Sequence, residues 1–193
     1  MSEWTLRRRD VVARLLGERG DALVILGLGA SAYDAAAAGD HPLNFYLWGA
    51  MGGAALMGLG LALAQPSRRV LVITGDGEQL MGLGGLATIA VQRPSNLALV
   101  VLDNERYGET GQQRTHTASG TDLAAVANAC GIVRSQLFTR DDELDALCAL
   151  VHAAPGPICA VVKVSPAVDT PVLPPRDGHY LKDRFRQALL GTA

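Results

Sequence analysis

The sequence predicts an α/β fold: a three-layer open parallel sheet flanked by helices on both faces. Short, continuous apolar runs alternate with helical segments along the chain, and such runs are typical of strands that are buried on both faces of a parallel sheet. The chain is 49% apolar but only 5% aromatic and contains 22 glycines, a composition that suits small, closely packed elements. Its 193 residues are enough for one domain with a substantial core.

Five apolar runs predict the strands, and each is bounded by glycine, proline or polar turn residues. In chain order they lie at 22–28, 44–48, 70–74, 97–102 and 158–164. Hydrophobic residues at helical spacing predict helices at 5–18, 31–38, 51–64, 79–91, 122–129, 141–152 and 179–190. The polar segment 108–120 predicts a loop. We assign residues 1–165 to one domain and residues 166–193 to a Pro-rich C-terminal tail and helix of the same domain.

Charge and cysteine content narrow the class of protein. The formal net charge of −2 does not favour nucleic acid or an anionic membrane as a partner, and the basic run Arg7–Arg9 predicts a solvated helix face. Cys130, Cys148 and Cys159 are odd in number and lack metal-ligand spacing, which predicts buried thiols in a reducing compartment. The N-terminus has no apolar core like that of a signal peptide, and the uncharged stretch 49–64 is short for a membrane span. We therefore expect a soluble cytoplasmic protein.

Two strand ends carry side chains suited to a metal-bridged diphosphate. Asp76 follows the third predicted strand and lies between Gly75 and Gly77, and Asn104 follows the fourth strand. In open α/β sheets, ligands bind outside the carboxyl ends of the strands. Carboxylate and amide oxygens suit Mg²⁺, and the glycines let backbone N–H groups approach an anion closely. The pattern predicts a diphosphate held through Mg²⁺.

A second glycine motif offers an alternative. Gly27-Leu28-Gly29-Ala30-Ser31-Ala32 fits the G-x-G-x-x-A form of a dinucleotide fingerprint after a strand. That fingerprint expects an acidic residue at the end of the next strand, but the run 44–48 is followed by Gly49. A nicotinamide-dependent oxidoreductase is therefore the weaker alternative.

Three motifs in order carry a resemblance to a known family. They are Gly75-Asp76-Gly77 with Asn104, the segment 44–52 (NFYLWGAMG) and the segment 102–108 (LDNERYG), and the polar segment 110–117 extends the match. Together they resemble the thiamine diphosphate (ThDP) enzymes, and most of all the phosphonopyruvate and sulfopyruvate decarboxylase group. The resemblance runs from about residue 20 to about residue 165 and is specific because three motifs agree in spacing. It implies the ThDP-binding fold, with residues 1–165 as the diphosphate-binding (PP) domain.

The resemblance implies roles for the residues around the diphosphate. Asp76 and Asn104 are expected to bind Mg²⁺ through their side chains, and Arg106 through its backbone carbonyl. Gly77 and its neighbours, Gly75 among them, would present N–H groups to the diphosphate. Glu78 stands where a small or hydroxylic residue is common, so it would repel the diphosphate unless it turns away. Outside this context Asp76 would be a helix N-cap and Asn104 a turn residue.

The resemblance also implies roles near the thiamine rings. The carbonyl of Gly49 is expected to accept a hydrogen bond from the aminopyrimidine. Met51 would lie beneath the cofactor and enforce its bent conformation, although a methionine here is also compatible with core packing. Tyr107 would form a wall of the cofactor site or anchor its loop. Ala50 stands where related sequences often carry serine.

The segment 108–120 is expected to form a lid over bound ligand, because its glycines and polar residues suit a loop that orders on binding. His116 is our candidate catalytic residue for proton transfer or anion contact, with Gln112, Gln113 and Thr115 as neighbours. A solvated histidine is the alternative. Arg114 would either contribute a charge to the substrate site or remain in solvent.

The family pattern also indicates what is missing. In this superfamily, a glutamate on a separate pyrimidine-binding domain activates the cofactor across a subunit interface. The sequence offers Glu3, Glu18, Glu78, Glu105, Glu109 and Glu143, and none follows a buried strand in the way that such an acid requires. A second domain of similar size would not fit within 193 residues. We therefore expect a separate pyrimidine-binding (α-type) subunit that supplies the glutamate, in an α₂β₂ or larger assembly.

These expectations combine into one function. The chain is predicted to be the β-type subunit of a split ThDP- and Mg²⁺-dependent decarboxylase that acts on a small 2-oxo acid and is active only with its partner. One alternative is a ThDP-dependent carboligase of the acyloin or acetolactate type, which differs in the fate of the intermediate. Another is a non-catalytic scaffold subunit that retains the fold.

Overall fold

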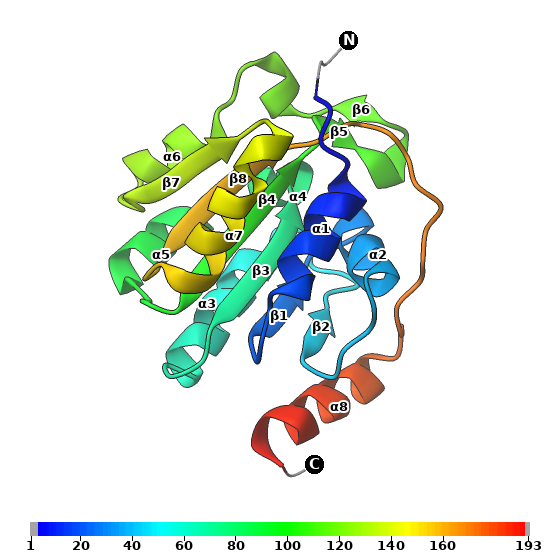
Figure 1. Cartoon of the computed structure of the whole chain (residues 1–193), viewed down its shortest axis with the longest axis vertical. Coiled ribbons are helices and arrows are strands. Elements are labelled where there is room, and N and C mark those ends of the chain that lie inside the picture. The colour runs from blue at the N-terminus through cyan, green and yellow to red at the C-terminus, as the bar shows by residue number, and fades with distance from the viewer. Residues whose placement is uncertain (1–3, 192–193) are drawn as a thin grey trace.

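The computed structural model describes residues 4–191 and contains a six-stranded parallel sheet with the order β2-β1-β3-β4-β8-β7 (Figure 1). The strands are β1 Leu23–Leu26, β2 Asn44–Tyr46, β3 Val70–Gly75, β4 Leu97–Asp103, β7 Arg134–Phe138 and β8 Ile158–Lys163. Every neighbouring pair in this sheet is parallel. A separate two-stranded antiparallel hairpin joins β5 Arg106–Tyr107 to β6 Gln113–Arg114. The predicted fold class is confirmed.

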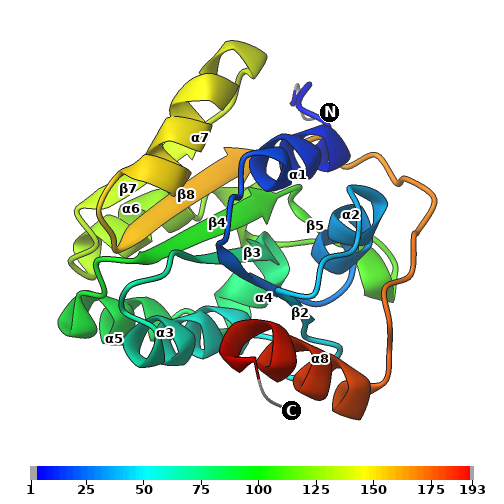
Figure 2. The same ribbon diagram turned by 60° about the horizontal axis from the view of Figure 1, so that its bottom comes forward.

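Helices cover both faces of the sheet, which makes three layers (Figure 2). One face carries α1 Arg8–Gly17, α2 Ala30–Ala37 and α7 Leu144–Ala153, and the other carries α3 Ala54–Ala64, α5 Gly85–Gln92 and α6 Leu123–Ala129. The remaining helices are α4 Asp76–Met81 and α8 Gly178–Leu190, with short 3₁₀ turns η1 Gly108–Thr110, η2 His116–Ser119 and η3 Asp141–Glu143. The five predicted strands and most of the predicted helices lie within a few residues of these elements.

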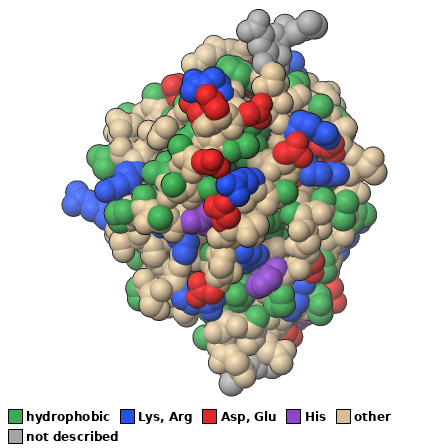
Figure 3. All heavy atoms as spheres, in the orientation of Figure 1, with side chains coloured by type: hydrophobic (Ala, Val, Ile, Leu, Met, Phe, Trp, Pro, Cys, Tyr) green, Lys and Arg blue, Asp and Glu red, His purple; other side chains and the backbone are tan. Residues whose placement is uncertain are grey.

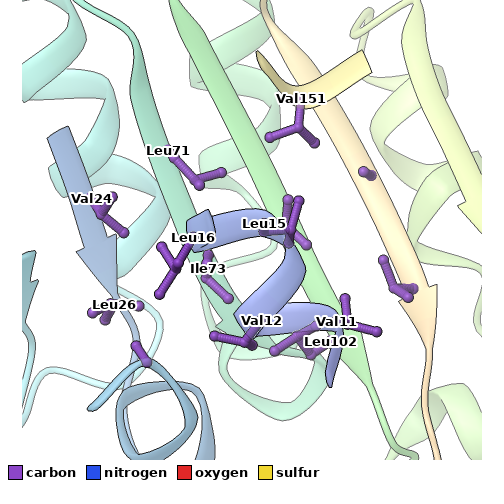
Figure 4. Packing of buried hydrophobic residues seen from close by; sticks show 14 of the residues in the cluster. Val11, Val12, Leu15, Leu16, Val24, Leu26, Leu71, Ile73, Leu102 and Val151 are labelled. Atoms are coloured by element: carbon purple, nitrogen blue, oxygen red, sulfur yellow. The ribbon is translucent and has the colours of Figure 1, made fainter. Parts of the chain in front are cut away.

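The packing of α1 shows how sequence fixes each layer. Val11, Val12 and Leu15 are fully buried, and Figure 4 shows them lying against side chains of the central strands. Fully burying one such side chain stabilises the fold by about 1.5–3 kcal/mol. Because α1 runs back toward β1, this packing fixes the first turn of α1 at the edge where the parallel strands end (Figure 1).

Two elements differ from the sequence predictions. The helix predicted at 79–91 is divided into α4 and α5 by residues 82–84. A Cβ at Gly82 would lie 2.2 Å from the carbonyl oxygen of Gly52, so the backbones approach each other here too closely for any side chain. Strand β7 was not predicted, because it is an edge strand in which only Phe138 is buried and no continuous apolar run marks it.

The Pro-rich segment 166–177 runs from β8 down one side of the molecule to α8 (Figure 1). It is attached along its length: Arg7 forms an ion pair with Asp169 (2.6 Å), and Trp48 Nε1 donates to the carbonyl of Pro175 (2.7 Å). Helix α8 then returns to the body of the protein, where Phe185 packs edge-on against Phe45 with ring centroids 5.9 Å apart.

The surface over α1, α2 and α7 carries acidic and basic side chains interspersed with apolar ones, without a large area of one sign (Figure 3). Within the described part of the chain, no helix is long and apolar enough to cross a membrane. Cys148 and Cys159 are buried and Cys130 is half-buried, and all three are free thiols.

Candidate functional site

A cavity of about 430 Å³ opens at the carboxyl ends of the central strands. Its walls come from the ends of β3 and β4, the loop after β1, the first turn of α1, the hairpin region and the segment 166–171. This volume lies in the range of small-molecule sites. Eight of the predicted site residues line it: Met51, Gly75, Asp76, Gly77, Glu78, Asn104, Arg106 and Tyr107. Two others, Gly49 and His116, are exposed and do not line it.

Asp76 is the best-defined polar group of the site. It is 1% exposed, and its Oδ2 accepts hydrogen bonds from the hydroxyls of Thr115 (2.6 Å) and Thr117 (3.2 Å). Thr117 also donates to Asp103 Oδ1 at 2.7 Å. A threonine hydroxyl has only one proton to donate. Thr115 donates its proton to Asp76, whereas the single proton of Thr117 is shared between Asp76 and Asp103. The β5–β6 hairpin makes this contact possible, because it folds the chain back over the start of α4.

The surroundings of Asp76 disfavour its charge. Burial raises the pKa of Asp76 to about 6, and the neighbouring Asp103 carboxylate adds to this rise, whereas the hydrogen bonds from Thr115 and Thr117 oppose it. Among residues 4–191, no lysine or arginine forms an ion pair with Asp76. A bound cation would supply the missing countercharge.

Asp103, by contrast, has a cationic partner within the chain. Lys163 Nζ lies 2.9 Å from Asp103 Oδ2 and 2.9 Å from Glu105 Oε1. Trp4 Nε1 donates to the same oxygen of Glu105 at 3.1 Å, and Lys163 also lies over the Trp4 ring. This cluster holds the end of β4 and ties Glu105 away from the cavity, whose lining does not include it.

Asn104 and Arg106 follow β4 directly. The Asn104 Oδ1 accepts a hydrogen bond from the backbone N–H of Arg106 (3.0 Å), and an amide oxygen keeps a second lone pair for a metal. Between them, Glu105 has a positive φ of 61°, and Ala50, beside Met51, has a φ of 53°. Non-glycine residues in this left-handed region are strained, and such strain gathers at functional sites.

Gly77 and Tyr107 are in direct contact. A Cβ at position 77 would lie 2.6 Å from the Tyr107 ring, so the ring covers the bare backbone of Gly77. Tyr107 therefore forms a wall of the cavity, in agreement with one of the two roles that the resemblance implies. Any larger residue at 77 would displace this wall.

Glu78 turns toward the loop after β1. Its Oε2 accepts hydrogen bonds from the backbone N–H of Leu28 (2.9 Å) and from the Thr74 hydroxyl (2.8 Å). The other carboxylate oxygen, Oε1, is buried and has no hydrogen-bond partner among the described residues. Glu78 is thus buried in the cavity wall rather than turned to solvent.

The expected lid is a folded hairpin rather than an irregular loop. Thr115 and Thr117 are buried and donate hydrogen bonds to Asp76, which the sequence did not predict. Gln112 lines the cavity. His116 and Arg114 are exposed, and Arg114 donates to the carbonyl of Ala118 (2.6 Å), so this chain brings neither side chain into the cavity.

Arg8 is a cavity-lining residue that the sequence did not predict. The run Arg7–Arg9 was predicted to be a solvated helix face, and this is wrong for Arg8, which is 9% exposed and lines the cavity. Its Nε donates to Asp34, which is completely buried. The signal was Asp34 itself, because a lone acid within the apolar segment 31–38 requires a cationic partner.

Charged side chains line the cavity unevenly. The acidic ones are Asp76, Glu78, Glu109 and Asp169, and the basic ones are Arg8 and Arg106. An anionic ligand would therefore need an accompanying cation. No group of three or more His, Cys, Asp or Glu side chains within the described residues is placed to hold a metal alone, so amide, backbone and ligand oxygens would have to complete a metal site here.

Comparison with known proteins shows which family the chain is similar to. The family described as thiamine pyrophosphate enzyme, C-terminal TPP binding domain, matches residues 27–164. Over 188 residues the chain is 42% identical to the sulfopyruvate decarboxylase subunit beta of Methanothermobacter thermautotrophicus, and the match covers 97% of both chains.

Two further proteins extend the comparison. The chain is 43% identical over 160 residues to phosphonopyruvate decarboxylase of Streptomyces viridochromogenes, a match that covers 82% of this chain and 40% of that protein. In structure it is similar to benzoylformate decarboxylase of Polynucleobacter necessarius, with a TM-score of 0.70 and 19% identity, covering 86% of this chain and 34% of that one. At this identity the structural likeness shows the fold alone.

Proposed function

Because this chain belongs to the thiamine pyrophosphate enzyme family through its TPP-binding domain, we propose that it is the diphosphate-binding subunit of a split 2-oxo acid decarboxylase that uses ThDP and Mg²⁺. One observation carries the proposal: Asp76, a buried acid without a cationic partner among the described residues, shares one cavity with Asn104 at the ends of adjacent strands. The beta-subunit relative and the phosphonopyruvate decarboxylase support the reaction class.

The residues present fit the cofactor. Asp76, Asn104 and the backbone carbonyl of Arg106 would hold Mg²⁺, with diphosphate oxygens completing its shell. Gly77 leaves its backbone open to the diphosphate, and Met51 lies at the cavity where the thiamine rings would enter. When bound, ThDP supplies the carbanion that adds to the ketone and the ring that accepts electrons as CO₂ leaves. The protein contributes orientation, the metal ligands and exclusion of water.

A separate pyrimidine-binding subunit is part of the proposal. The relative that matches over nearly its full length is named a beta subunit, whereas the match to phosphonopyruvate decarboxylase covers 40% of a longer chain. We propose that the partner supplies the activating glutamate and that the assembly is α₂β₂ or larger. The Glu3 carboxylate lies outside the described residues. Of the glutamates in the cavity wall, Glu78 is bonded to Leu28 and Thr74, and Glu109 accepts from Tyr33 (3.3 Å).

The surface of α3 favours such a partner. Helix α3 contains no polar side chain, yet Leu56 and Leu63 are 43% and 51% exposed. Met81 is also exposed, at 63%, and lines the cavity. An exposed apolar surface next to a ligand site is typical of a protein interface. The free thiols suit a reducing compartment, and we propose the cytoplasm as the location.

Two measurements test the proposal. ThDP-dependent decarboxylation of sulfopyruvate or phosphonopyruvate should require this chain together with the candidate α subunit, and full activity of this chain alone would refute the split architecture. Asp76→Ala should abolish Mg²⁺-dependent ThDP binding in the complex, whereas Asp142→Ala, at an exposed site, should not. Unchanged binding in Asp76→Ala would overturn the metal assignment.

The interface can be tested separately. Leu56→Glu should prevent assembly with the α subunit, as measured by light scattering after size-exclusion chromatography. Val172→Glu, also at an exposed apolar residue but in the segment 166–177, is the matched control. Equal assembly of the two variants would place the partner elsewhere. Carboligation is distinguished by adding an aldehyde to the active pair, since a dominant hydroxyketone product would favour it.

A further inference from the structure

Arg8 and Arg9 share one buried acid. Asp34 is completely buried in α2, and its two carboxylate oxygens accept from different arginines: Oδ2 from Arg8 Nε, and Oδ1 from Arg9 Nε at 3.1 Å. Two positive charges therefore face one negative charge, and the group carries a net charge of +1. Arg9 uses a terminal nitrogen to donate to the carbonyl of Thr170 (2.8 Å).

Of the two arginines that contact Asp34, Arg8 is the one that places its positive charge at the cavity. Arg8 lines the cavity and Arg9 does not. Among residues 4–191, the terminal nitrogens Nη1 and Nη2 of Arg8 form no hydrogen bond, yet neither is sealed in the interior without a partner. Because Arg8 lines the cavity, these donors are available to a ligand bound there. The packing of α1 on the sheet (Figure 4) and the bond to Asp34 hold the guanidinium in this position.

We propose that Arg8 binds a tetrahedral oxyanion group inside the cavity. The two terminal nitrogens of a guanidinium form a planar fork that matches two oxygens of such a group. Two sources are compatible with the proposed function, on which this inference rests: the terminal phosphoryl group of the ThDP diphosphate, and the sulfonate or phosphonate of the substrate. Ser31, at the start of α2, lies in the same wall and can donate a further hydrogen bond.

The test compares Arg8→Gln with Arg9→Gln in the full-length chain. Both variants remove one partner of Asp34, so they control for the loss of an ion pair, but only Arg8 faces the cavity. Calorimetric titration would use Mg²⁺-pyrophosphate as the probe for the cofactor source. Sulfoacetate added to protein already saturated with Mg²⁺-ThDP would probe the substrate source. Both titrations use the complex of this chain with the candidate α subunit, in which the proposed cofactor site is complete.

We expect Arg8→Gln to weaken one of the two probes by about 10- to 100-fold, the amount for hydrogen bonds to a charged group, and Arg9→Gln to change neither by more than about twofold. A loss for pyrophosphate identifies the diphosphate, and a loss confined to sulfoacetate identifies the substrate anion. Arg8→Lys keeps the charge without the fork and should lie between; it also serves if Arg8→Gln fails to fold. Equal affinities of the wild-type, Arg8→Lys and Arg8→Gln complexes for both probes would overturn the proposal.

The proposed function can fail separately from the role of Arg8. A wild-type complex that binds Mg²⁺-ThDP but shows no effect at position 8 retains the proposed function and loses the Arg8 contact. A wild-type complex that binds neither Mg²⁺-ThDP nor either probe at millimolar concentration contradicts both.

Discussion

Asp34 and Asp76 are equally inaccessible, at 0% and 1% exposure, but their surroundings are opposite. Asp34 lies at the junction of α1 and α2 between two arginines that this chain provides. Asp76 lies at the junction of β3 and α4, where it receives only threonine hydroxyls and has a second acid, Asp103, nearby.

The difference separates an acid that is paired within the fold from one that is not. A buried charge is costly unless it is paired, and Asp34 meets this requirement within the fold. Asp76 does not meet it among the described residues, and under the proposed function its countercharge would be the bound Mg²⁺. Burial alone would not have distinguished the two residues, whereas the partners of each carboxylate do.

The largest effect should come from removing the structural acid. Asp34→Ala leaves the buried Arg8 without its anion, and breaking a buried pair in this way costs about 3–5 kcal/mol of the free energy of unfolding. Urea unfolding measures it. Asp145→Ala removes a carboxylate from an exposed pair with Arg14 and should cost about 0–1 kcal/mol. Similar losses in both variants would mean that Asp34 is not the buried anchor described here.

The next effect concerns pH. In the metal-free chain the folded pKa of Asp76 is about 6, above an unfolded value of about 3.9. The folded state therefore holds this proton more tightly, so its stabilising contribution is present below pH 4 and is lost as the pH rises toward 6. The loss is roughly 2–3 kcal/mol. It should appear as a difference between wild type and Asp76→Asn in unfolding experiments from pH 4 to 7, and parallel curves would contradict the unpaired state of Asp76.

A smaller effect should follow from the hydroxyl that orients Asp76. Thr115→Val keeps the shape of the side chain but removes the 2.6 Å hydrogen bond. Loss of a residue that orients a metal ligand weakens metal binding by about 10- to 100-fold. The Mg²⁺ dependence of ThDP binding measures this, with Thr115→Ser expected to restore it. Thr88→Val, at an exposed threonine of α5 that does not line the cavity, should have no effect.

The smallest effect is expected at Glu78. Glu78→Gln retains an oxygen for the Leu28 N–H and the Thr74 hydroxyl but removes a negative charge from the cavity wall. Mg²⁺-pyrophosphate should then bind about 2- to 5-fold more tightly, because a like charge near the ligand is gone. Glu109→Gln, at an exposed lining residue, should change the affinity less because solvent screens it. Weaker binding to Glu78→Gln would show that the carboxylate assists the ligand.

The sequence was sufficient for the sheet and for the position of Asp76 and Asn104 at the ends of adjacent strands, because continuous apolar runs mark buried strands. It was insufficient wherever a contact joins distant segments. Thr115 is 39 residues from Asp76, and only the β5–β6 hairpin brings them together. No local pattern in a polar loop distinguishes such a threonine from a solvated one.

The surroundings of charged residues were also predicted poorly from the sequence. The pattern Arg7–Arg9 is typical of an exposed helix face, and only its partners show that the three arginines differ: Arg7 binds Asp169 at the surface, whereas Arg8 is enclosed. The Pro-rich segment was treated as a tail, yet residues 166–169 line the cavity. Family membership and the relation to decarboxylases were predicted correctly from the motifs.

Helix α8 also protects the protein against aggregation through an exposed sheet edge. Strand β2 ends the sheet on one side, and an uncovered edge strand can pair with the edge of another molecule. Arg184 donates to the carbonyl of Asn44 (3.1 Å) and pairs with Asp40 (2.5 Å), while Phe185 packs against Phe45. The last helix thus shields that edge, so a shortened chain that keeps every residue of the cavity wall would still lose its protection against aggregation.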